Sequence, residues 1–379
     1  MPGPTLQVSG SAYQLSRIQL RSFVQTTLPW TSIDQTLTAS DWSTVPTVAA
    51  YAYRLSPRLG AAFGVWVPVS GSLSLVSNVH SAGPLPGSAV QVDYTQQIAL
   101  TQRQESTYFG AAAGLEVRPG LRVGAATFLV YDRQEQFVEV FAGALTTSSQ
   151  TGATSSASLR GTPSQLAARL GLGLQWDVVP SCTIAAALKT PTLSLRTFGA
   201  FTTVDQSASL LPGAAPEVTF MQGSAPVTGT LEPWRIALGS AFAVGGTSVR
   251  AELDWQSPRA GRSGTVNGRV GVLRAVTSDL AWGAGFFTDR SRDVVSTGTL
   301  SIDYYGVSAG VDYRPPPVRS ARPAGATWDV RTSLAVRYAL GVGEVQRLQA
   351  SPFGAPEPSS TASVLAHALG VNLGALLQF

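Results

Sequence analysis

Large apolar residues and small or polar residues alternate with a period of two along most of this chain. In QLAARLGLGLQWDV (165–178), Leu170, Leu172 and Leu174 fall on one side, and glycine, arginine and glutamine fall on the other. The segments SVRAELDWQ (248–256) and WDVRTSLAVRYALGV (328–342) repeat the pattern. A period of two is typical of a β-strand whose two faces meet different environments. No segment of comparable length shows helical spacing, so the sequence predicts an all-β chain.

Short turns and long polar loops alternate between these segments. Short turns are predicted at SPR (56–58), RPG (118–120) and VGG (244–246), whereas long polar stretches cover 146–164 and 314–326. Short turns at one end and long loops at the other indicate a transmembrane antiparallel up-and-down β-barrel. We expect one barrel domain over residues 1–379, with about 14 strands and an acceptable range of about 12 to 16.

A soluble β-sandwich or propeller would show a similar alternation, because its strands also bury one face. Its exposed face would be rich in charged residues, but here the second face consists largely of glycine, alanine and serine. Charged residues make up 13% of the chain, against about 25% in typical soluble domains. Many strands also reach the roughly 9–11 residues that cross a tilted bilayer. These features favour the membrane barrel.

The alternation assigns side chains to faces. Leu170, Leu172, Leu174, Leu334, Val336, Leu340 and Leu373 are expected to face lipid, and Arg169, Arg250, Arg331, Arg337 and Asn372 the lumen. Four lumen arginines could meet a ligand carboxylate: Arg169, Arg235, Arg331 and Arg337. The alternative for each is an ion pair with an acidic residue on a neighbouring strand.

The chain ends in GVNLGALLQF, where apolar residues again alternate. Val371, Leu373, Leu377 and the terminal Phe379 resemble the C-terminal signal that outer-membrane barrels present to their assembly machinery. This resemblance implies that β-barrel assembly machinery is a partner and that the last strand closes the barrel.

Composition argues against several function classes. The net charge is +4, arises from dispersed arginines and one lysine, and indicates no nucleic-acid partner. With one cysteine and two histidines, no metal site and no cofactor are expected. A barrel phospholipase would place a serine two residues from a lipid-facing histidine, but Leu369 occupies that position relative to His367. We therefore expect no enzyme activity.

Three stretches resemble the long-chain fatty-acid transporter family, which is FadL-like and includes aromatic-hydrocarbon transporters. They are 46–71 (PTVAAYAYRLSPRLGAAFGVWVPVSG), 170–201, and the tandem hairpins 232–255 and 268–291. The resemblance implies a bacterial outer-membrane protein that passes hydrophobic or amphipathic molecules, such as long-chain fatty acids, without energy input. It would contact membrane lipid and a hydrophobic ligand as a monomer. The alternative is a general diffusion porin or a structural barrel without a specific ligand.

The sequence departs from this family at its start. Members begin with an N-terminal hatch that carries an Asn-Pro-Ala motif, and no such motif occurs here. Residues 1–12 are set apart as a short N-terminal segment and a possible hatch remnant. The first residues also lack the basic and apolar regions of a signal peptide. Either the start lies too far downstream or the barrel has no plug.

Lateral release of ligand, which the resemblance implies, needs a break in strand pairing. Proline cannot donate a ladder hydrogen bond, so it is tolerated inside a membrane strand only where the freed groups find other partners. Pro68, in FGVWVPVSG, is the first candidate, with Trp66 as a nearby lumen residue, and Pro191 is the second. The alternative places Pro68 at the frayed extracellular end of its strand.

Overall fold

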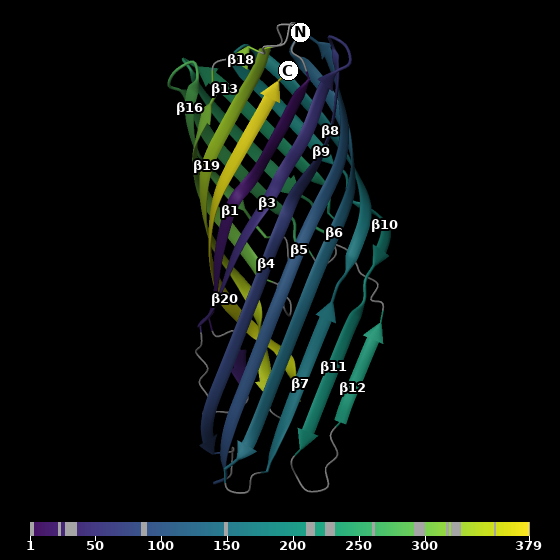
Figure 1. The fold of residues 1–379 in the computed structure, drawn as a ribbon, viewed down its shortest axis with the longest axis vertical. Helices are drawn as coiled ribbons and strands as arrows, with labels where there is room; N and C mark the ends of the chain where they lie inside the picture. The colour runs from purple at the N-terminus through teal and green to yellow at the C-terminus, as the bar shows by residue number, and fades with distance from the viewer. Residues whose placement is uncertain are drawn as a thin grey trace.

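Fourteen antiparallel strands close into a ring, which confirms the predicted all-β barrel (Figure 1). The ring closes because β1 pairs with β3 along one edge and with β20, the last strand, along the other. In ring order the strands are β1 (Thr5–Arg21), β3 (Thr36–Arg54), β4 (Leu59–Pro84), β5 (Gln91–Arg118), β6 (Leu121–Thr146), β8 (Ser164–Val179), β9 (Cys182–Lys189), β13 (Arg235–Val244), β14 (Thr247–Gln256), β15 (Thr265–Ala275), β16 (Leu280–Asp289), β17 (Leu300–Tyr313), β19 (Thr327–Ser351) and β20 (Gly354–Gln378).

Six further strands lie outside the ring. They are β2 (Val24–Thr26), β7 (Gly152–Gly161), β10 (Leu193–Phe198), β11 (Phe201–Ser209), β12 (Glu217–Gly223) and β18 (Val318–Arg319). The computed structural model describes residues 4–21, 24–26, 36–84, 89–147, 151–209, 217–223, 232–259, 262–291, 300–315, 318–319, 327–351 and 354–378. Within these ranges, no helix is long and apolar enough to span a membrane.

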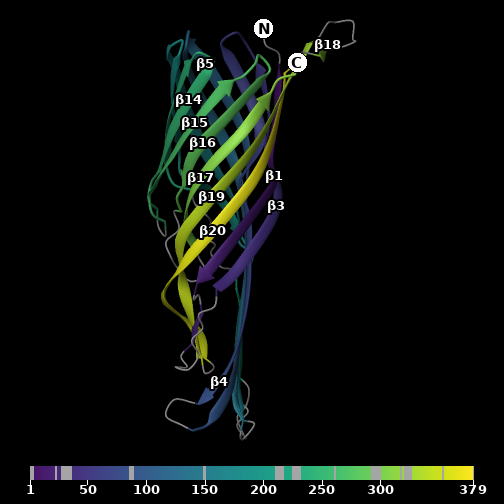
Figure 2. The same ribbon diagram turned by 90° about the vertical axis from the view of Figure 1, so that its left-hand side faces the viewer.

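Both chain ends lie at the end of the barrel where the turns are short (Figures 1 and 2). Gly245 and Gly246 have φ angles of 55° and 76° and join β13 to β14 in two residues. Positive φ at both positions is what a type I′ hairpin turn requires, and glycine adopts it without strain. By the usual polarity of outer-membrane barrels, the short-turn end is periplasmic and the opposite end extracellular.

The predicted outward face is confirmed by exposure. Leu172, which two glycines flank within the strand, is 58% exposed on the outer surface. Leu170, Leu174, Leu334, Val336, Leu340 and Leu373 are exposed in the same way. On the other face, Arg250, Arg337 and Asn372 line a cavity in the lumen. Large apolar side chains therefore face lipid and the smaller, more polar file faces inward.

Adjacent residues of β20 allow a direct test of these faces. We expect Leu373→Arg to lower the free energy of unfolding by about 2–4 kcal/mol, because it places a charge in lipid near the middle of the apolar band. Asn372→Arg is the matched control and should cost much less, because residue 372 faces the lumen cavity. Urea unfolding in lipid vesicles measures both. Equal losses for the two variants would contradict the assignment of faces.

Residues 1–12, set apart in the sequence as a short N-terminal segment, are divided by the structure. Residues 1–3 lie outside the described ranges, and Thr5–Ser11 belong to β1. Thr5 stands opposite Gln378 of β20 and Ala52 of β3, so its backbone pairs on both sides. This part of the chain therefore belongs to the barrel wall, where it closes the ring between β20 and β3.

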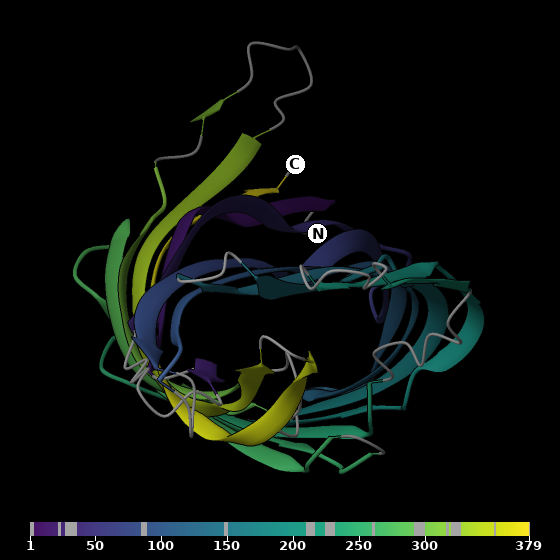
Figure 3. The ribbon, with the colours of Figure 1, turned by 90° about the horizontal axis from the view of Figure 1, so that it is seen from below.

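One part of the wall continues far beyond the barrel at the extracellular end (Figures 1 and 2). We call it the extracellular sheet: residues 69–84 of β4, 91–106 of β5 and 134–146 of β6, together with β7, β11 and β12. It forms because β6 changes partner along its length, from β8 over residues 121–133 to β7 over 136–145. Seen from the extracellular end, the strands form an elongated ring (Figure 3).

Candidate functional site

The ladder between β3 and β4 stops at Pro68. Its last pair joins Val48 to Trp66, and beyond it β4 pairs only with β5 in the described part of the chain. At the same point β4 contains a bulge, in which Val67 and Pro68 stand opposite the single residue Thr107. Such bulges bend a strand and locally end its pairing. Since β3 continues upstream of Val48 with β1 as its partner, the two strands separate here towards the extracellular side.

A second interruption lies between β9 and β13, next to Pro191. Lys189 is the last residue of β9 and stands opposite Arg235, the first residue of β13. After residues 190–192 the chain continues as β10, which pairs with β8 and with no other described strand. The wall between the two interruptions, β4 to β9, is the part that leads into the extracellular sheet.

Arg169 bridges the second interruption. Its side chain is only 3% exposed and donates from Nε to the carbonyl of Thr190 (2.7 Å) and from Nη2 to the carbonyl of Pro233 (2.9 Å). Its Nη1 lies 3.9 Å from Oε2 of Glu232. Buried carbonyls that lose a ladder partner must find another donor. The guanidinium group supplies two such donors, one on each side of the break.

Aromatic side chains surround a single lysine in the lumen beside Pro68. The Nζ atom of Lys189 lies 4.6 Å from the ring centroid of Trp66 and 5.6 Å from that of Phe128. Tyr108 packs between these rings, with centroids 5.2 Å from Trp66 and 6.0 Å from Phe128. Cation–π attraction of this kind contributes about 0.5–2 kcal/mol. We call Trp66, Tyr108, Phe128 and Lys189 the aromatic cluster.

The cluster depends on one glycine. Phe128 lies flat over Gly110, where an added Cβ would come within 2.8 Å of the phenyl Cδ1 atom. A side chain at position 110 would therefore displace the ring towards the lumen. Lys189 itself has no ion pair and no hydrogen bond within the described ranges. It is a partly buried cation without a directly bonded counter-charge, and the carboxylates of Asp254 and Glu232 act on it only from a longer distance.

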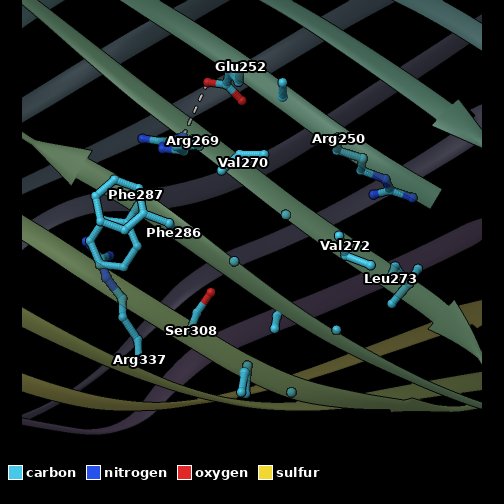
Figure 4. A pocket seen from close by; sticks show the side chains of 18 of the residues that line it. Arg250, Glu252, Arg269, Val270, Val272, Leu273, Phe286, Phe287, Ser308 and Arg337 are labelled. Carbon is cyan, nitrogen blue, oxygen red and sulfur yellow. Dashed lines mark hydrogen bonds and ion pairs between the residues drawn. The ribbon is translucent and has the colours of Figure 1, made fainter. Parts of the chain in front are cut away.

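A cavity of about 880 Å³ lies in the lumen along β13 to β20 and reaches β9. Figure 4 shows Arg250, Arg269 and Arg337 directed into it, with Glu252 as the partner of Arg269 at 3.3 Å. The guanidinium of Arg337 lies 3.8 Å from the ring centroid of Phe287. The cavity thus combines cations, a carboxylate and an aromatic ring. Such a lining suits an amphipathic molecule better than a purely apolar one.

The four arginines singled out in the sequence do not form one site. Arg235 makes a bidentate ion pair with Asp254, and Arg331 makes one with Asp312 near the periplasmic end. Arg337 lies within 4.0 Å of Asp289. Arg169 holds backbone carbonyls, so each of the four has a protein partner. Only Arg235 and Arg331 pair with an acidic residue on a neighbouring strand, the alternative stated above.

The remaining sequence-based site residues lie in the C-terminal part of β20 or directly after it. Val371, Leu373 and Leu377 are in ladders with β1 and β19, whereas Phe379 lies outside the described residues. His367 contacts the hydroxyl of Tyr338 at 2.8 Å on the outer surface. Neither a metal-binding group of His, Cys, Asp and Glu nor a helix is present among the described residues.

Lys189 is the functional candidate that sequence reasoning missed. Its signal was available, because it is the only lysine of the chain and stands in LKTP, two residues before Pro191. Its aromatic neighbours come from β4 and β6, more than 60 residues upstream for Phe128 and more than 120 for Trp66. No local pattern could have indicated that grouping.

Solved structures of outer-membrane transporters and channels share this architecture. A FadL homologue of Pseudomonas aeruginosa aligns with a TM-score of 0.61 and 12% identity, over 99% of this chain and 90% of that chain. The toluene transporter TodX of P. putida aligns with a TM-score of 0.61 and 13% identity, over 100% and 90%. The monoaromatic hydrocarbon channel CymD gives a TM-score of 0.50 at 11% identity, over 100% and 89%.

No protein-family model matches this sequence, and no curated protein matches it either. At identities of 11–13%, likeness to the solved structures shows the fold and leaves substrate and site residues to be argued from this chain. The alignments nevertheless extend over almost the whole chain and include the closed ring of 14 strands. The chain has the fold of the FadL-like outer-membrane β-barrels.

Proposed function

We propose that this protein transports hydrophobic or amphipathic small molecules passively across a bacterial outer membrane. The observation that carries the proposal is that the aromatic cluster lies directly beside the break in the β3–β4 ladder. An apolar molecule bound by Trp66 and Phe128 would lie close to the opening at Pro68, and the opening would lead it to lipid. The names of the structural neighbours, a toluene transporter and hydrocarbon channels, support the same class of cargo.

Pro68 has a defined part in this proposal. The bulge and the missing β3 partner would let ligand leave sideways into the bilayer rather than through the periplasmic end. Trp66 would form the lumen side of that opening. The protein would act as a monomer in contact with membrane lipid, and Val371, Leu373, Leu377 and Phe379 would direct its assembly.

Long-chain fatty acids are the substrate that we propose within this class. Their alkyl chain would lie on the aromatic rings, and their carboxylate would form the direct ion pair that Lys189 does not make with the protein. Lys189 is favoured over the four arginines because each of those already has a protein partner.

A general diffusion porin is the competing function, and liposomes separate the two. Purified protein in liposomes should accelerate uptake of a labelled fatty acid without allowing swelling in small sugars. Rapid swelling in sugars that is unaffected by added fatty acid would instead establish a porin. Empty liposomes and heat-denatured protein are the controls.

The role of Lys189 can be tested by matched ligands. We expect Lys189→Gln to weaken binding of decanoate by about 10- to 100-fold, the usual worth of a hydrogen bond to a charged partner. Binding of decanol should change little, because the alcohol does not need the charge. Quenching of tryptophan fluorescence measures both, and Arg331→Gln is the control for loss of a lumen cation. An equal loss for decanol and decanoate would contradict an ionic role.

A further inference from the structure

Apolar side chains from the inner faces of many strands meet in the extracellular half of the lumen. These side chains are buried and belong to eight strands of the ring. We call them the lumen core: Leu20, Ala39, Leu75, Ile98, Leu100, Val140, Ile302, Val345, Ala362, Val364 and Ala366.

The lumen core joins opposite walls of the barrel. Val140 belongs to β6 and Ile302 to β17, and these strands are seven steps apart in either direction around the ring of 14. A single contact cluster that contains both must cross the lumen. The distal part of β20 also approaches β7 of the extracellular sheet directly. The extracellular sheet therefore lies against β17, β19, β20 and β1 with its inner face.

The contact is dry. Leu20 and Ala366 are 0% exposed and Val345 is 1% exposed, although all three would border an aqueous channel in an open barrel. Transfer of an ion into such a region costs several kcal/mol or more, and apolar constrictions in channels close by losing water. An apolar solute pays no comparable penalty, because it replaces one apolar contact by another.

The two ladder interruptions leave this contact free to open. Beyond Pro68 the extracellular sheet has no ladder to β3, and beyond Lys189 the wall that carries it has no ladder to β13, within the described residues. At the second interruption, isolated hydrogen bonds take the place of a ladder: Arg169 donates to the carbonyl of Pro233, and the Thr192 N–H donates to the carbonyl of Glu232. A displacement of the sheet away from the opposite wall therefore breaks no strand ladder.

We propose that the lumen core is the permeability barrier of this protein: it closes the lumen to ions and polar solutes and admits apolar molecules by displacement of the extracellular sheet. Leu75, Ile98 and Val364 are then residues that determine specificity. The direction and kind of cargo rest on the proposed function, but the barrier itself can be measured without any cargo.

Neighbouring residues of β4 give a matched test. Leu75 is a member of the lumen core, whereas Val76 points to the other face of the same strand and is 59% exposed. Conductance of single proteins in planar lipid bilayers in potassium chloride should be very low for the natural protein and for Val76→Glu. Leu75→Glu should conduct in steps several times larger, because a carboxylate hydrates the core.

A second variant covers the case in which Leu75→Glu fails to fold. Ile98→Ala removes volume without adding charge and should also raise conductance, by a smaller factor. The proposal is overturned if the natural protein already conducts as well as the variants, or if folded Leu75→Glu or Ile98→Ala conducts no better than Val76→Glu. Folding is checked by the heat-dependent mobility shift of closed barrels on gels.

This outcome is separate from that of the proposed function. A protein that takes up fatty acid in liposomes but conducts ions freely would keep its transport function and lose the barrier. A protein with low conductance that rises in Leu75→Glu, but without fatty-acid uptake, would keep the barrier and lose the proposed cargo.

Discussion

Arg169→Met is expected to lower the free energy of unfolding of the barrel by about 3–5 kcal/mol, the usual cost of removing one partner from a buried ionic contact. The variant keeps most of the side-chain volume but leaves the carbonyls of Thr190 and Pro233 without their donor. Glu232 would also lose its neighbouring charge. The two carbonyls would then have to remain in a largely buried site without this donor.

Urea unfolding in phospholipid vesicles, followed by the fluorescence of the eight tryptophans, measures this loss. Arg331→Met is the matched control, because its bidentate pair with Asp312 involves a half-exposed side chain. Pairs of that kind contribute about 0–1 kcal/mol. If Arg169→Met lost no more stability than Arg331→Met, Arg169 would not hold the interruption together, and a direct role in ligand binding would become the better explanation.

Deletion of Phe379 is expected to remove most of the barrel from the membranes of living cells while leaving its refolding in detergent nearly unchanged. The reason is that the assembly role proposed for Phe379 is needed only where the assembly machinery operates. The rest of the β20 ladder, from Gly354 to Gln378, is present in the deleted protein. Its pairing with β1 and β19 does not depend on residue 379.

The amount of heat-modifiable barrel in outer-membrane fractions gives the first quantity, and the yield of refolding in detergent gives the second. Phe379→Tyr is the control and should behave as the natural protein, because it keeps the aromatic ring. Equal reduction of both quantities in the deletion would mean that Phe379 serves packing alone.

The alternation of side chains carried enough information for the barrel, its faces and its approximate size. In β8, Leu170 and Leu172 could be assigned outward from neighbouring residues alone, because a strand repeats every two residues. The excess of glycine and alanine on the other face then argued against a soluble sandwich, because the exposed face of a sandwich is rich in charged residues. These inferences need only local sequence, and the structure confirms them.

The break at Pro68 was partly within reach, because proline has a local effect on pairing. The sequence could place a candidate there, but it could not tell that β3 ends its ladder at Val48. The partners of the arginines were beyond reach for a different reason. Arg235 meets Asp254 through the register of two strands, and register is set by the whole ring rather than by either segment.

The lumen core was not anticipated at all. Ile98 and Val364 are separated by more than 260 residues, and in a regular barrel their strands would face each other across water. Apolar residues at these inward positions conflicted with the expected polar lumen, and this conflict was the only available signal. The contact arises because the extracellular sheet packs against the distal parts of β17, β19 and β20, a property of the complete fold.

The last strand has two tasks that the structure makes inseparable. β20 pairs with β1 to close the ring, and it also contributes Ala362, Val364 and Ala366 to the lumen core. A barrel that has inserted all strands except β20 would lack both its final seam and part of its seal. Closure of the ring and loss of leakiness therefore coincide in time. A cell that assembles this protein is exposed to an open pore only for the lifetime of the last unpaired strand.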